Sequence, residues 1–312
     1  MIEKNIIAAD GHEIQTYIWP HDAAKGWVHI VHGMAEHAAR YDDFAKNLVA
    51  AGYAVVAHNH RGHGASHISS QNNGENNGKK PVLGVYKGSN GWQNYVQDIA
   101  AVRADICAHQ QPYFIFGHSM GSFIAQSYLA QQPQNVAGLI LSGSNHQAVW
   151  LSRVGGFVAK IESLRLGRDN SSSLLQFLSF GSFNQKFKPN RTAFDWLSRD
   201  AAQVDKYIAD PLCGFACSTG LWSDFLAGLA ELYKPNNLKN IAADMPIFIL
   251  GGAHDPVGLM GTGLPKLLKA YKDSGHKNLS LKLFENGRHE MLNETNKSET
   301  YAEIIKWLDQ QN

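Results

Sequence analysis

Cysteine is scarce in this sequence. The 312 residues include three cysteines, Cys107, Cys213 and Cys217, which is an odd number and too few for a disulfide framework in a chain of this length. Cys213 and Cys217 have a spacing that a metal or redox pair can adopt, but no second cluster accompanies them. We therefore interpret both as small apolar residues near the start of a helix.

An excess of charge of either sign is also missing. Lysine and arginine number 28 and aspartate and glutamate 27, so the formal net charge at pH 7 is +1. The basic residues form no long run. Proteins that bind nucleic acid through charge concentrate lysine and arginine, so we expect no nucleic-acid partner.

Long apolar runs are absent as well. No stretch approaches the roughly 20 apolar residues that cross a bilayer. Residues 1–5 do not resemble a secretory signal, because they lack a basic region followed by an apolar one. These absences predict a cytoplasmic protein, or one that is peripheral to a membrane.

Short apolar runs do occur, and they alternate with longer segments of helical period. This alternation is typical of strands that cross over through helices into a largely parallel sheet, so we predict one large α/β domain. The predicted strands are residues 27–31, 54–57, 113–116, 136–141, 247–250 and 279–284. The predicted helices are residues 42–51, 92–108, 122–131 and 298–311, and residues 2–19 are expected to form an antiparallel pair of strands.

The alternation breaks twice. Residues 71–78 are polar, contain glycine and have no period, so they predict an exposed loop. Residues 146–212 contain no convincing strand, and we interpret them as a helical cap inserted between two parts of the core, 1–145 and 213–312. The helices predicted in the cap are residues 149–166, 173–180 and 192–208. A set of ordinary crossover helices is the alternative.

Ser119 lies in a Gly-x-Ser-x-Gly segment, Gly117 to Gly121, that joins a predicted strand directly to a predicted helix. In this context the segment predicts a nucleophile elbow, a tight turn that exposes the serine hydroxyl above the sheet. Side chains at the two glycine positions would collide in such a turn. Ser119 is therefore the predicted nucleophile.

A serine hydroxyl needs a general base, and the base needs a carboxylate to orient it. Asp255 follows the predicted strand 247–250, and His289 follows strand 279–284. Both therefore lie beyond the carboxyl ends of parallel strands, where Ser119 also emerges. Their order along the chain is the one this topology requires, so His289 is the predicted base and Asp255 the predicted acid.

Rival residues are less suitable. His118 is next to the nucleophile in a turn that points it away, and His254 directly precedes the acid, so surface or packing roles are expected for both. Asp244 lies before a strand and Asp273 within a helix-like segment. Solvated roles are expected for these two carboxylates.

Two backbone N–H groups are the expected oxyanion donors. One belongs to Met120, directly after the nucleophile, and the other to Met34, in the segment that follows strand 27–31. Gly33 allows the backbone there to approach a substrate carbonyl closely. Because the nucleophile, base and oxyanion donors all come from the chain, we expect no metal and no organic cofactor.

At these motifs the sequence resembles the monoglyceride lipase and lysophospholipase branch of the α/β-hydrolases. The matching segments are His32 to Tyr41 (HGMAEHAARY), His58 to Ser66 (HNHRGHGAS), Gly117 to Ser122 (GHSMGS), Gly251 to Val257 (GGAHDPV) and Gly287 to Glu290 (GRHE). The resemblance implies a cap over the active site, the triad Ser119, Asp255 and His289, and oxyanion donors at Met34 and Met120. It favours a lipid-like monoester, such as a monoacylglycerol or a lysophospholipid, as substrate.

The resemblance is weakest at two places. Asn59 stands where relatives commonly have Asp, and since that segment looks structural we expect an altered loop contact rather than lost chemistry. The cap is the other place, and its aromatic residues suit either an acyl-chain tunnel or ordinary packing. They include Trp150, Phe157, Phe177, Phe180 and Trp196. Apolar cap segments also predict transient contact with a membrane surface.

Other activities stay open, because the same scaffold carries carboxylesterases for small esters, thioesterases and peptidases that act at chain N-termini. A proline iminopeptidase-like enzyme needs acidic cap residues to bind the substrate ammonium. The candidates are Glu162, Asp169, Asp195, Asp200 and Asp205. A ligand receptor on the same scaffold is the non-enzymatic alternative.

Overall fold

The computed structural model describes residues 1–66, 82–86, 90–107, 111–234 and 236–312. Within these residues the strands form one eight-stranded sheet in the order β1-β2-β4-β3-β5-β6-β7-β8. The strands are β1 (Ile2–Ile7), β2 (Glu13–Trp19), β3 (Trp27–Val31), β4 (Ala54–His58), β5 (Tyr113–His118), β6 (Gly138–Ser142), β7 (Ile247–Gly252) and β8 (Leu279–Phe284). The exposed loop expected at residues 71–78 lies outside the described residues.

The sheet is mostly parallel. β1 pairs with β2 and β2 with β4 in antiparallel fashion, and the other pairs are parallel. β4, β5, β6 and β7 are buried along their whole length, which explains why their sequences do not alternate. β8 is an edge strand and is mostly half-buried. The predicted α/β fold is confirmed.

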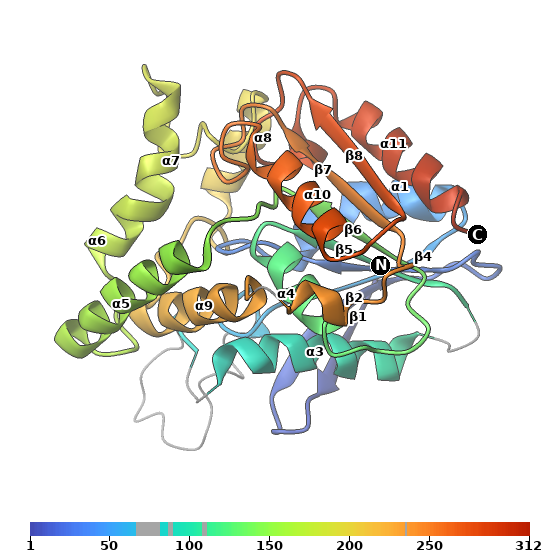
Figure 1. The fold of residues 1–312 in the computed structure, drawn as a ribbon, viewed down its shortest axis with the longest axis horizontal. Helices are drawn as coiled ribbons and strands as arrows, with labels where there is room; N and C mark the ends of the chain where they lie inside the picture. The colour runs from blue at the N-terminus through green and yellow to red at the C-terminus, as the bar shows by residue number, and fades with distance from the viewer. Residues whose placement is uncertain (67–81, 87–89, 108–110, 235) are drawn as a thin grey trace.

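Helices cover both faces of the sheet (Figure 1). One layer consists of α3 (Gly91–Ile106), α4 (Met120–Leu129) and α10 (Gly263–Asp273), and the other of α1 (Asp42–Ala50) and α11 (Lys297–Asp309). The first layer buries side chains such as Ile99, Ile124 and Leu267 against the sheet. The second buries Phe44 and Trp307 against the opposite face. Burial of apolar area on both faces is the main stabilising term in such a fold.

A long helical segment connects β6 to β7 and lies at one side of the molecule in Figure 1. Its helices are α5 (Val149–Leu166), α6 (Ser173–Gln176), α7 (Ser182–Asn184), α8 (Ala201–Ala209) and α9 (Thr219–Leu232). The helix predicted at 149–166 matches α5. The helix predicted at 192–208 is wrong in its first half, because helical structure begins only at Ala201. The end of the cap at residue 212 stays a prediction.

Side-chain hydrogen bonds explain that error. Asp195 accepts the backbone N–H groups of Arg191 and Thr192, which closes a turn before a helix can begin. Asp200 then accepts the N–H of Ala202 and acts as the N-cap of α8. Short polar side chains compete with the helical backbone in this way and favour turns and caps. Among the described helices, none is long and apolar enough to cross a membrane.

The register of the sheet brings the loops that contain the predicted site residues to one edge of the sheet. In successive parallel pairs Val31 is opposite Gly117, His118 is opposite Ser142, and Gly252 is opposite Phe284. Because the carboxyl ends of parallel strands meet at the same edge, the loops after β3, β5, β7 and β8 all open there.

Candidate active site

The turn after β5 holds Ser119 in a rare backbone conformation. Its φ is 51° and its ψ −121°, and α4 begins at the next residue. A side chain at positive φ costs free energy, so the surrounding packing must impose the turn. A Cβ at Gly121 would lie 2.0 Å from the carbonyl oxygen of Val31, and a Cβ at Gly117 would lie 2.7 Å from the carbonyl oxygen of Gly121. The backbone packs too closely for any other residue at these two positions.

Asp255 and His289 meet between the loops after β7 and β8. His289 Nδ1 lies 2.9 Å from Asp255 Oδ1, and both side chains are buried. The N–H of Val257 donates to the same carboxylate oxygen at 2.8 Å and helps to fix it. Burial lowers the pKa of His289, but the Asp255 carboxylate outweighs burial, and the pKa is raised from its usual 6.5. With Nδ1 directed at Asp255, Nε2 is the nitrogen left to exchange a proton.

Rings surround His289. The ring of Trp196 lies 5.0 Å from that of His289, and the ring of His118 lies 4.7 Å away, between centroids. A Cβ at Gly143 would lie 2.8 Å from His289 Cε1, so glycine is needed for the ring to fit. In the described part of the chain no hydrogen bond joins Ser119 to His289. Such bonds often tighten only when substrate is bound.

Ser119 borders a cavity of about 350 Å³. The described residues that line it include no charged side chain. Most are apolar: Met34, Met120, Phe123, Leu151, Leu178, Phe180, Phe183, Trp196, Trp222, Phe225, Leu226, Leu229, Pro256, Val257 and Leu259. The volume and the apolar walls are typical of a site for a small organic ligand.

The five aromatic residues noted in the sequence divide into two groups. Phe180 and Trp196 are buried and line the cavity. Trp150, Phe157 and Phe177 have exposed fractions of 62%, 65% and 55%. Helical period alone does not separate the groups, because it does not tell which face of a cap helix meets the core and which meets solvent.

The loop after β3 lies beside the elbow. Its Ala35 has φ 58°, and the N–H of Gly33 donates to Glu36 Oε1 at 2.6 Å. Within the described residues, neither the N–H of Met34 nor that of Met120 donates a hydrogen bond. Both residues line the cavity that Ser119 borders. Met34 and Met120 therefore stay the candidate oxyanion donors.

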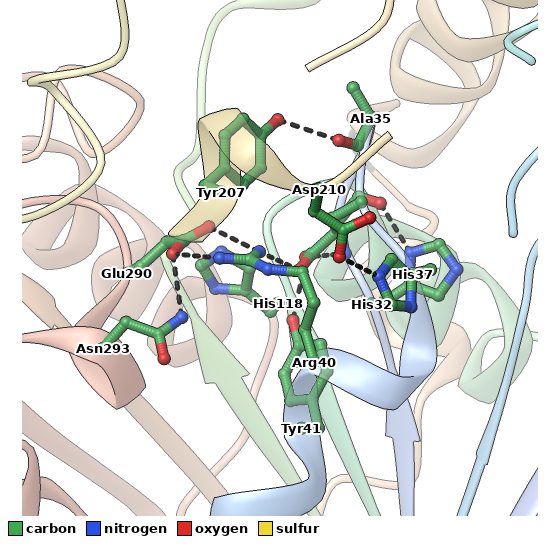
Figure 2. Close-up of polar contacts among 12 residues, drawn as sticks. His32, Ala35, His37, Arg40, Tyr41, His118, Tyr207, Asp210, Glu290 and Asn293 are labelled. Carbon is green, nitrogen blue, oxygen red and sulfur yellow. Dashed lines mark hydrogen bonds and ion pairs between the residues drawn. The ribbon is translucent and has the colours of Figure 1, made fainter. Parts of the chain in front are cut away.

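A buried group of charges lies behind this loop (Figure 2). Arg40 donates to both carboxylate oxygens of Glu290 at 2.8 Å and also donates to Glu36. Burial raises the pKa of Glu290, but Arg40 outweighs burial and holds this pKa at about 2. For Glu36 burial prevails over Arg40, and its pKa is raised. The group ties the loop after β3 to the residue that follows His289.

Sequence reasoning assigned no role to this charged group, although Glu36, Arg40 and Glu290 all lie in the matching segments. The available signal was the spacing of Glu36 and Arg40, since opposite charges four residues apart can pair along a helical turn. Nothing in the sequence indicates that Glu290 joins them, because its contact depends on the tertiary fold.

Of the rival residues, His118 packs against His289, and the other three lie away from it. His118 is buried, and burial together with the neighbouring His289 lowers its pKa to about 3, so the ring is neutral. His254 and Asp244 are exposed. Asp273 forms an exposed ion pair on α10. None of these residues lines the cavity beside Ser119.

Asn59 makes a loop contact. Its Oδ1 accepts the N–H of Ala38 at 2.8 Å, and its Nδ2 donates to Gln15 Oε1 at 2.5 Å. An aspartate accepts but does not donate when ionised, so the bond to Gln15 is the contact that asparagine adds. A Cβ at Gly64 would lie 2.1 Å from Asn59 Nδ2, which requires glycine at that position.

The acidic residues of the predicted cap are engaged elsewhere. Glu162 pairs with Arg165, and Asp205 pairs with Arg191. The other three close a turn, cap a helix or are exposed: Asp195, Asp200 and Asp169. Asp210, the sixth acidic residue of this segment, pairs with His37. None of the six is among the described residues that line the cavity, so no carboxylate of residues 146–212 faces a ligand ammonium there.

Comparison with known proteins gives the class. A family model described as serine aminopeptidase, S33, matches residues 22–296. The chain therefore belongs to this family of the α/β-hydrolase superfamily. Within the superfamily it is a serine hydrolase that acts on ester bonds.

Several proteins of similar sequence are lipases. The chain is 25% identical to the monoglyceride lipase of Homo sapiens over 315 residues, which covers 98% of this chain and 90% of that protein. It is 26% identical to the monoacylglycerol lipase of Mycolicibacterium smegmatis over 314 residues, which covers 98% and 96%.

Solved structures agree on the fold. A carboxyl esterase from Bacillus coagulans has a TM-score of 0.85 at 24% identity, over 99% of this chain and 98% of that one. A soluble variant of the monoglyceride lipase from Saccharomyces cerevisiae, in complex with a substrate analogue, has a TM-score of 0.73 at 21% identity, over 100% and 96%. These likenesses confirm the predicted α/β-hydrolase fold.

Proposed function

We propose that this chain hydrolyses the carboxylic ester of a lipid-like monoester, a monoacylglycerol or a lysophospholipid. The observation that carries the proposal is the apolar, uncharged cavity of about 350 Å³ beside Ser119. An acyl chain leaves water when it enters such walls, which is favourable by about 0.8 kcal/mol per CH₂ group. The monoglyceride lipases among the relatives support the same substrate class.

The polar lining residues strengthen this proposal. Asn145 donates to the carbonyl oxygen of Val257 and accepts the hydroxyl of Tyr233, at 2.7 and 3.0 Å. Both side chains are therefore satisfied within the protein. These two side chains therefore need no hydrogen bond from a ligand, which suits an acyl chain.

In the proposed mechanism Ser119 Oγ attacks the ester carbonyl while His289 Nε2 takes the hydroxyl proton. Asp255 holds the ring and stabilises the imidazolium. The N–H groups of Met34 and Met120 donate to the oxyanion of the tetrahedral intermediate. His289 then protonates the leaving alcohol oxygen, and an acyl-enzyme remains. Water attacks it by the same route and releases the fatty acid.

The peptidase alternative is disfavoured by the cavity wall. A substrate with a free amino terminus brings a charged ammonium, which is costly to bury without a carboxylate partner. The five acidic candidates of the cap are engaged elsewhere, as described above. Carboxylesterase or thioesterase activity on smaller substrates needs no such partner. Comparison of the rates with long-chain and short substrates distinguishes these activities from lipase activity.

We propose further that residues 146–212 act as a cap that meets a lipid surface. Its exposed apolar side chains include Trp150, Phe157 and Leu164 on α5, with exposed fractions of 62%, 65% and 80%. Such side chains gain free energy when they enter the interfacial region of a bilayer. Phe157→Ser should reduce co-sedimentation with liposomes, whereas Leu283→Ser, on the edge strand β8, should not. Equal binding of both variants and the wild type would contradict this proposal.

The test of the proposed function compares substrates and a variant. Hydrolysis is measured with the wild-type chain and with Ser119→Ala, as fatty-acid release from a long-chain monoacylglycerol and a lysophospholipid, as release of the alcohol from a short ester, and as release of the amine from an aminoacyl amide. We expect release from a lipid monoester by the wild type alone. Turnover of the amide without turnover of either lipid would sink the substrate assignment, and undiminished turnover by Ser119→Ala would sink the nucleophile assignment.

A further inference from the structure

Three potential metal ligands of different kinds, His37, Asp210 and Cys213, lie together where the loop after β3 meets the segment after α8. One potential ligand atom from each lies within 4.8 Å of the other two. His37 Nε2 is 2.8 Å from Asp210 Oδ2, and Figure 2 shows these two side chains facing each other. His37 comes from the loop after β3, and the other two come from the segment after α8. An imidazole, a carboxylate and a thiol from two distant segments thus meet at one point.

The surroundings carry an excess of negative charge. The charges of Glu36, Glu290, Asp210 and Arg40 all act on the Cys213 thiol. Three of these groups are carboxylates and one is a guanidinium. Arg40 is already paired with two of the carboxylates, and Asp210 has the His37 ring and the N–H of Leu212 as partners, at 2.8 Å each. A cation beside Asp210 would offset this imbalance.

We propose that His37, Asp210 and Cys213 bind one Zn²⁺ ion, with water as the fourth ligand. Nitrogen, sulfur and carboxylate oxygen together are a donor set that Zn²⁺ accepts. Mg²⁺ and Ca²⁺ prefer oxygen alone, so they fit less well. Binding releases the thiol proton to solvent and requires the His37 ring to carry its proton on Nδ1.

The geometry needs only local adjustment. With Zn–N of about 2.0–2.1 Å and Zn–S of about 2.3 Å, ligand atoms in a tetrahedral site stand about 3.4–3.6 Å apart. The three atoms here lie within 4.8 Å of one another. Movements of about 1 Å by side chains in two loops therefore close the site.

The ion would strengthen the connection between two segments that already touch. Tyr207 and Gly214 donate to the carbonyl oxygen of Ala35, from the hydroxyl and the N–H, at 2.8 and 2.9 Å. Ala35 follows Met34, the expected oxyanion donor. An effect of Zn²⁺ on hydrolysis rests on the proposed function, but binding of Zn²⁺ does not.

Binding is tested by equilibrium dialysis of the full chain against Zn²⁺ and by the absorption of Co²⁺ bound in its place. The variant Cys213→Ser removes the thiolate, and Cys217→Ser is the matched control four residues away. We expect one tightly bound ion per chain in the wild type and in the control. In Cys213→Ser the affinity should fall more than about 100-fold, since even the loss of a hydrogen-bond partner of a ligand costs about 10- to 100-fold.

The Co²⁺ spectrum gives a second readout. The wild type should show a thiolate-to-metal charge-transfer band that is absent in Cys213→Ser, and Asp210→Asn should weaken binding while retaining the band. Circular dichroism without metal checks that each variant folds. No stoichiometric binding by the wild type, or equal affinity in Cys213→Ser, would overturn the site and leave His37 and Asp210 as an ion pair between two loops.

Discussion

The sheet edge and the helical segment above it are built differently. At the edge, Ser119 is held at positive φ by backbone packing, and Asp255 and His289 are almost fully buried. In the helical segment, α5 exposes apolar side chains such as Phe157 and Leu164. The side chains at the sheet edge are therefore held in a fixed geometry, whereas those on α5 are free to contact an apolar surface. The proposed function accordingly assigns the chemistry to the sheet edge and contact with the lipid to the helical segment.

The two regions also use charge differently. The Arg40 pair with Glu290 is buried, with side-chain exposures of 12% and 8%. In the helical segment, the Arg191 pair with Asp205 has side-chain exposures of 48% and 58%. A buried pair fixes its partners strongly because a lone buried charge is costly, whereas an exposed pair contributes little.

The largest expected effect is on the chemistry of the edge. His289→Ala should lower kcat by about 10⁵- to 10⁶-fold, because the serine loses its base. Its control is His254→Ala, which removes an exposed histidine of the loop after β7 and should leave kcat within about twofold of the wild type. Rates with a soluble ester measure both. A comparable loss in His254→Ala, or none in His289→Ala, would break the assignment of the base.

The next effect concerns stability. Arg40→Met leaves Glu290 buried without its partner and should reduce the free energy of unfolding by about 3–5 kcal/mol. Arg191→Met, at the pair with Asp205 that is exposed on both sides, should cost less than about 1 kcal/mol. Urea unfolding at pH 7 compares the two. Similar losses of unfolding free energy in both variants would mean that burial does not make the Arg40 pair more important for stability than the exposed pair.

A smaller effect should appear in selectivity. Leu226 lines the cavity, and Leu226→Trp should lower kcat/KM for a long-chain ester by about 10- to 100-fold through lost volume, while short esters are little affected. Leu164→Trp is the matched control, since Leu164 is 80% exposed. The ratio of long- to short-chain kcat/KM is the measurement. A shift in that ratio for the control alone would place acyl selection outside the cavity.

The smallest expected effect is on the pH dependence of kcat/KM. Asp255 raises the pKa of His289 above 6.5, and the base acts only when neutral, so kcat/KM should rise with pH through this raised pKa. Below it the rate should fall about tenfold per pH unit. In Asp255→Asn the residual activity should have its midpoint at lower pH, because the carboxylate that favours the charged ring is gone. A midpoint that does not move would assign the titration to another group.

Sequence patterns predicted the core well and the helical segment poorly. Strands 27–31 and 279–284 were predicted with the bounds that the structure gives β3 and β8, because buried strands between turn residues have a strong local signal. The helix start at Ala201 was missed because it depends on side-chain bonds of Asp195 and Asp200. Local propensity does not report such bonds.

The residues of the candidate site were likewise predicted only in part. Motifs at strand ends indicated Ser119, Asp255 and His289, because strand order and turn chemistry together place them at one edge. The charged group of Glu36, Arg40 and Glu290 was not predicted, since Glu290 is 250 residues from Arg40 along the chain. Contacts of that separation depend on the completed fold rather than on any local pattern.

The most direct test of the account is to find the residue that carries the acyl group. The wild-type chain is treated with a long-chain alkyl fluorophosphonate, which reacts with an activated serine, and the digested protein is analysed by mass spectrometry. The account predicts one adduct, on the peptide that contains Ser119, formed rapidly in the wild type and at least about 1000-fold more slowly in His289→Ala. An adduct on another residue, or equal labelling of the His289→Ala variant, would contradict it.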